Sequence, residues 1–165
     1  MSSELPAPPD PLRVCAVLAA ASGVIHIEAA IAHTSHWWLF GVFFAGLAYA
    51  QLGWALVVYR GRRDARLLDA AIYVSLAVVA IWLWSRTVGL PIGPWAGDAE
   101  GIGIADTVAT LDELALAALL TMVLRPAGRV GRALGWIRGD HTTRLGMMLG
   151  SASVLALAMA GHGHH

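Results

Sequence analysis

The chain has 165 residues, of which 58% are hydrophobic and only 13% are charged. This balance is far too apolar for a water-soluble domain and predicts a membrane protein. Eleven arginines balance eleven acidic residues, so the chain carries no net charge at neutral pH. Because no basic surface is indicated, we expect no nucleic-acid partner.

Five apolar stretches are each close to the roughly 20 residues that a helix needs to cross a bilayer. They are predicted at residues 12–33, 37–59, 67–86, 105–124 and 143–160. We therefore expect an all-α fold, a polytopic membrane helix bundle with five transmembrane helices. A flexible leader, residues 1–11, would precede it, and a His-rich tail, residues 161–165, would follow. The lipid bilayer is the first partner that this fold implies, and the GxxxG of residues 146–150 could support a homo-oligomer or a larger membrane complex.

The arginines gather on one side of this predicted bundle. Arg86 alone lies on the opposite side from Arg13, Arg60, Arg62, Arg63, Arg66, Arg125, Arg129, Arg132, Arg138 and Arg144. Short loops rich in positive charge stay in the cytoplasm. The sequence thus predicts a cytoplasmic N-terminus and an extracytoplasmic C-terminus in a cytoplasmic (inner) membrane.

Six of the seven histidines fall on the predicted outer side. Within the first span, His26 and His33 are seven residues apart, which places them two turns apart on one helix face. Asp106 and Glu113 have the same spacing in the fourth span. If these two helices are neighbours, His33 would lie level with Asp106 and His26 level with Glu113. The four side chains would then form an outward-opening column of imidazoles and carboxylates.

Imidazole and carboxylate together are the ligands that Zn, Fe and Cu(II) prefer. The sequence therefore predicts binding of a transition-metal ion (Cu, Zn or Fe) between the first and fourth spans, for sensing, storage or handling. The candidate ligands are His26, His33, His36, Asp106, Glu113, His162, His164 and His165. An ionisable group inside a bilayer is costly and normally faces a partner or a cavity, which favours a functional role for His26 and Glu113.

Two other interpretations use the same residues. In the first, the metal serves a membrane enzyme that acts on a lipid or quinone-like substrate, with Glu113 as the base. In the second, the chain is a metal-free accessory subunit and its polar pairs only fix helix packing. Whether the protein is an enzyme stays open at this point.

Several polar residues have simpler structural interpretations. Asp106 is well placed to cap the fourth span, and Gln51 is expected to hydrogen-bond across the bundle as a packing residue. Glu28 lies on a different face from His26, and Arg86 is its expected partner, with Asp98, Glu100 and Asp106 as further carboxylates that could neutralise Arg86. Arg86, Glu100 and Glu28 are therefore the candidates for the loop and for an anionic ligand.

The loop after the third span carries a recognisable pattern. It reads Trp84-Ser85-Arg86-Thr87-x-Gly89-Leu90-Pro91-x-Gly93-Pro94, followed by Glu100, Gly103 and Asp106. This pattern, with the turn that holds His26, His33, His36 and Trp37, resembles small multi-pass membrane proteins of high-GC, actinobacterial-type bacteria. The resemblance implies a bacterial cytoplasmic membrane and no particular activity. Nearly twenty residues with several glycines and prolines predict a shaped lid over the column.

Overall fold

A computed structural model describes residues 10–125 of the chain. It contains four helices, α1 (Pro11–Thr34), α2 (Trp38–Tyr59), α3 (Ala65–Thr87) and α4 (Ile104–Leu124). The first four predicted spans agree with these helices to within two residues at either end. The predicted fifth span and the His-rich tail lie outside the described residues.

Local sequence signals explain where the helices begin. The side chain of Asp10 caps α1 by accepting a hydrogen bond from the Leu12 amide at 3.1 Å, and Pro11 occupies the first helical position. Asp64 caps α3 by accepting from the amides of Arg66 and Leu67 at 3.0 and 3.2 Å. These caps satisfy backbone groups that the first turn of a helix leaves without partners.

All four helices are long and apolar enough to cross a membrane. No strand occurs between residues 10 and 125. An α-helix satisfies its own backbone hydrogen bonds, which is the requirement for a segment surrounded by lipid. The described part of the chain is therefore all-helical and compatible with a multi-pass membrane protein.

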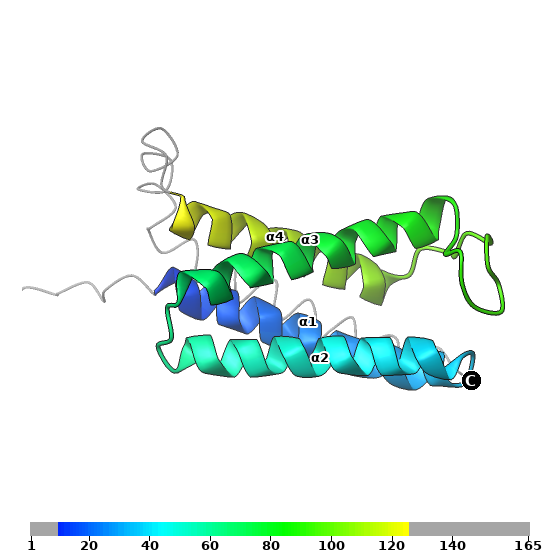
Figure 1. The fold of residues 1–165 in the computed structure, drawn as a ribbon, viewed down its shortest axis with the longest axis horizontal. Coiled ribbons are helices and arrows are strands. Elements are labelled where there is room, and N and C mark those ends of the chain that lie inside the picture. The colour runs from blue at the N-terminus through cyan, green and yellow to red at the C-terminus, as the bar shows by residue number, and fades with distance from the viewer. Residues whose placement is uncertain (1–9, 126–165) are drawn as a thin grey trace, which may run out of the picture.

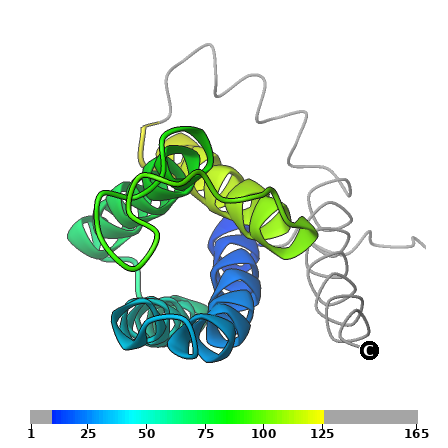
Figure 2. The same cartoon turned by 90° about the vertical axis from the view of Figure 1, so that its right-hand side faces the viewer.

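Each helix runs antiparallel to the one before it in the chain (Figure 1). α1 contacts both α2 and α4, and α4 contacts α3. Viewed from the end, the four helices follow one another around a ring in the order α2, α1, α4, α3 (Figure 2). One end of the bundle carries the α2–α3 turn with Arg60, Arg62 and Arg63, and we call it the arginine end. The other end carries the α1–α2 turn and the long connection between α3 and α4, and we call it the loop end.

The aliphatic core lies toward the arginine end. It joins residues of all four helices, including Leu12, Cys15, Leu18, Ala55, Val58, Leu68, Ile72, Leu116 and Leu120. Close approach of α1 and α2 requires a small residue at Gly23, where an added Cβ would lie 3.0 Å from Cγ of Leu52. Toward the loop end, the interior between α1, α2 and α4 is polar and aromatic instead.

Candidate functional site

Four buried polar side chains from three helices meet inside the bundle. We call Ser22 and His26 of α1, Gln51 of α2 and Glu113 of α4 the polar centre. Ser22 and Glu113 are completely buried, and His26 and Gln51 are only 4% and 6% exposed. Contact between α1 and α4, which the sequence-based hypothesis required, is present.

The polar centre is joined by a continuous chain of hydrogen bonds. Nδ1 of His26 lies 2.8 Å from Oε1 of Gln51, and Nε2 of Gln51 donates to Oε1 of Glu113. The hydroxyl of Ser22 donates to the same carboxylate oxygen at 2.7 Å. Because an amide oxygen can only accept, Nδ1 of His26 is the donor, and the neutral ring therefore has its lone pair on Nε2.

Glu113 lies near the middle of α4. The helix rise of 1.5 Å per residue puts it roughly 14 Å from the loop end of that helix, about half the thickness of a bilayer's hydrocarbon core. A charged side chain at that depth costs roughly 2.5–3.5 kcal/mol on insertion scales. Its second oxygen, Oε2, is buried and has no hydrogen-bond partner among residues 10–125. Glu113 is thus buried near the middle of its helix, and both of its hydrogen bonds to described residues go to Oε1.

Arg86 is committed to other carboxylates. Its guanidinium donates to Glu100 and, at 2.6 Å, to Asp106. Asp106 also accepts from the Gly103 amide at 3.1 Å. The N-cap of α4 is therefore Gly103 rather than Asp106 as the sequence suggested, and Asp106 caps the helix end from the third helical position. The expected pairing of Arg86 with Glu28 is not formed. Oε2 of Glu28 is instead buried with no hydrogen-bond partner in the described part of the chain.

His33 and His36 lie at the loop end of α1. Nδ1 of His33 donates to the Ala29 carbonyl at 2.8 Å, and Nδ1 of His36 donates to the Ala32 carbonyl at 3.0 Å. The predicted level pair of His33 and Asp106 is not joined, because Asp106 is held by Arg86. The column therefore divides into a buried part at His26 and Glu113 and an outer part formed by His33 and His36.

Aromatic rings connect these two parts. The ring of Phe44 on α2 is stacked on His26 with centroids 5.9 Å apart and lies 4.9 Å from the ring of His33. The rings of His33 and His36 are 6.2 Å apart, and Trp95 meets His36 edge-on at 5.5 Å. A continuous series of rings thus runs from the polar centre to the loop.

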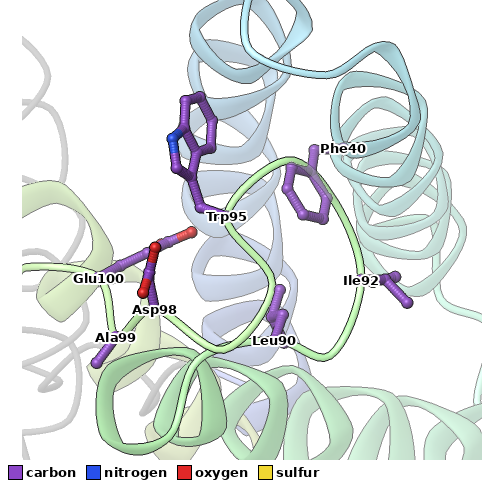
Figure 3. Close-up of a pocket in the computed structure, with 7 residues that line it drawn as sticks. All are labelled: Phe40, Leu90, Ile92, Trp95, Asp98, Ala99 and Glu100. Atoms are coloured by element: carbon purple, nitrogen blue, oxygen red, sulfur yellow. The ribbon is translucent and has the colours of Figure 1, made fainter.

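The long loop between α3 and α4 is shaped by backbone contacts. Gly89 has a φ of +75°, and a Cβ there would lie 2.5 Å from the carbonyl oxygen of Asp98. The Glu100 amide donates to the Ser85 carbonyl at 2.9 Å. The loop encloses a pocket of about 210 Å³ against the first turns of α2, lined by Phe40, Leu90, Ile92, Trp95, Asp98, Ala99 and Glu100 (Figure 3).

The expectation that Gln51 hydrogen-bonds across the bundle is confirmed by its bonds to His26 and Glu113. Those two partners were not predicted, and Ser22 was not singled out. Within residues 10–125, no group of three or more His, Cys, Asp or Glu side chains is arranged to hold a metal ion. The polar centre by itself offers one imidazole, one carboxylate and the oxygens of Ser22 and Gln51. His162, His164 and His165 lie outside the described residues.

Comparison of the chain with protein-family models, with curated proteins and with solved structures gives no match.

Proposed function

We propose that this protein is a multi-pass protein of a bacterial cytoplasmic membrane that binds a transition-metal ion at the polar centre, for sensing, storage or handling of that ion. The observation that carries the proposal is Glu113. It is completely buried near the middle of α4, it is linked to His26 through Gln51, and one of its oxygens has no hydrogen-bond partner among the described residues.

The electrostatics of the centre favour a bound cation. Ser22 and Gln51 are neutral donors, and two neutral hydrogen bonds compensate only part of the cost of burying a carboxylate charge. Arg86 does not neutralise Glu113, since its guanidinium pairs with Glu100 and Asp106. A cation taken up from outside would complete the charge balance.

The donor types favour a transition metal over calcium or magnesium. Neutral imidazole nitrogen together with carboxylate oxygen suits Zn, Cu and Fe, whereas hard cations are held by oxygen alone. Nε2 of His26 and Oε2 of Glu113 would supply the two protein ligands. The oxygens of Ser22 and Gln51 are the candidates for the rest, and the three tail histidines would collect the ion at the mouth of the site.

The distribution of charge supports access from the extracytoplasmic side. Arg60, Arg62, Arg63 and Arg125 all lie at the arginine end, and the positive-inside rule assigns such an end to the cytoplasm. His33, His36 and the loop then face outward. Because the aliphatic core occupies the arginine end, a site closed on the cytoplasmic side fits better than a pore.

Elemental mass spectrometry on full-length, detergent-purified protein tests the proposal, provided that no metal-affinity step is used. We expect about one metal ion per chain in the wild type. Glu113→Gln and His26→Ala should contain little metal, because each removes one of the two protein ligands. Asp69→Asn is the matched control, because Asp69 is a partly exposed carboxylate near the arginine end, 3.9 Å from Arg125.

A variant with His162, His164 and His165 replaced by alanine separates the centre from the tail. The proposal requires that this variant keep the metal. Metal that is lost with the tail and retained in Glu113→Gln would assign binding to the tail and overturn the proposal. Absence of metal from the wild type after metal-replete growth would also overturn it, and would favour the interpretation in which the polar centre only fixes helix packing.

A further inference from the structure

His33 and His36 are each held in one tautomer by the last turns of α1. Each ring donates its Nδ1 proton to a backbone carbonyl of α1, from Ala29 and Ala32 respectively. A carbonyl oxygen can only accept, so in the neutral ring the lone pair is on Nε2. Metal-binding histidines are commonly oriented in this way, by a hydrogen bond from the nitrogen that does not bind the metal.

The two rings are close enough to share one ion. Their centroids are 6.2 Å apart. With metal–nitrogen bonds of about 2.0–2.1 Å, two imidazoles on one tetrahedral ion have centroids roughly 5 Å apart, so the observed separation is only about 1 Å longer than one shared ion requires. His36 is exposed and His33 half-buried, which leaves the pair accessible from the loop end.

The pair also lies beside an aromatic ring that contacts the polar centre. His26 and His33 follow one another on one side of α1, His36 comes two residues after the end of that helix, and the Phe44 ring contacts both His33 and His26. The Phe44 ring is therefore the apolar group that lies between the accessible imidazoles of His33 and His36 and the buried imidazole of His26.

We propose that His33 and His36 form a receiving site that binds a divalent transition-metal ion through two imidazole nitrogens and passes it by Phe44 to the polar centre. The transfer half of this inference depends on the proposed function, whereas the two-nitrogen site does not. The pair would raise the effective concentration of the ion at the entrance, which speeds filling of the buried site without changing its final occupancy.

The probe is Cu²⁺, added to full-length protein in detergent and followed by electron paramagnetic resonance, in which nitrogen couplings count the bound imidazoles. The background variant carries alanine at His141, His162, His164 and His165, so that only the three described histidines remain. We expect a two-nitrogen signal that is lost in His33→Ala and in His36→Ala and retained in His26→Ala. The polar centre should give a separate one-nitrogen signal that disappears in His26→Ala.

Filling kinetics test the transfer. In the double variant His33→Ala/His36→Ala, the one-nitrogen signal should reach its wild-type amplitude more slowly, by roughly tenfold or more. An unchanged filling rate would overturn the transfer. Failure of the background variant to show any two-nitrogen signal would overturn the receiving site.

The same spectra separate failure of this inference from failure of the proposed function. A two-nitrogen signal without any one-nitrogen signal would leave the receiving site standing and reject metal binding at the polar centre. A one-nitrogen signal that fills at the same rate with and without His33 and His36 would leave metal binding at the polar centre standing and reject the transfer.

Discussion

The hydroxyl of Ser22 donates a hydrogen bond of 2.7 Å to Oε1 of Glu113, and this bond joins α1 to α4 inside the bundle. Serine is small enough to let two helices approach, and its hydroxyl is one of the donors that commonly link helices in membranes. Together with the bond from Gln51, it fixes the carboxylate between three helices while leaving Oε2 for another partner.

Ser22→Ala should weaken the contact between α1 and α4. Interhelical hydrogen bonds of this kind contribute about 0.6 kcal/mol on average and up to about 1.7 kcal/mol. We expect a loss in that range, measured as the free energy of unfolding in detergent. Ser75→Ala is the matched control, since Ser75 is also buried on α3 but has no hydrogen bond to another helix within residues 10–125. Equal losses in the two variants would contradict this prediction.

Gln51→Met should be more damaging than Ser22→Ala, because it removes two buried hydrogen bonds at once and leaves the His26 ring without its acceptor while nearly conserving volume. Nδ1 of His26 loses its acceptor and Oε1 of Glu113 loses a donor. A buried polar group without a partner costs about 1–3 kcal/mol. We expect lower stability in the same unfolding assay and reduced metal content. A variant as stable and as metal-loaded as the wild type would show that the bridge is dispensable.

Arg86→Gln should release the loop between α3 and α4. The Arg86 side chain is only 11% exposed, and from the end of α3 it binds Glu100 in the last part of the loop and Asp106 in the first turn of α4. Its removal leaves two carboxylates facing each other without a cation, so amide hydrogen exchange at residues 95–103 should become faster. The control is Arg63→Gln, which loses an exposed ion pair with Asp10 that is worth at most about 1 kcal/mol. No change in loop exchange would refute the clamp.

Gly89→Ala should distort the loop more than Gly97→Ala does. Both glycines have positive φ, +75° and +87°, so both substitutions carry a similar backbone cost of about 1–2 kcal/mol. At Gly89 the new Cβ would also meet the backbone of Gly97 and Asp98, whereas at Gly97 nothing lies within 4 Å. Amide hydrogen exchange at residues 95–103 measures the difference. Equal effects would mean that the close approach at Gly89 does not matter.

Much of the fold could be predicted from the sequence, because a bilayer imposes a length and a composition on every helix that crosses it. The first four spans agree with the observed helices to within two residues. Spacing alone also placed His26 and Glu113 deep on their helices, since the helix repeat converts seven residues into two turns.

The partners within the site could not be predicted in the same way. Spacing along one helix fixes the relative depth of two residues but not the rotation of the neighbouring helix. The packing of α1 against α2 therefore decided that Gln51 stands between His26 and Glu113. Likewise, the loop brought Glu100 to Arg86 and left Asp106 with that arginine rather than with His33.

The sequence by itself determined that the chain is helical and apolar enough for a membrane, where the helices begin and end, and which ionisable residues lie deep. These properties are local, because they depend on composition, capping and the helix repeat. Only the tertiary structure decided which deep residues touch. Hydrogen bonding and ring contacts act over a few ångströms between segments far apart in the chain, and packing alone sets those distances.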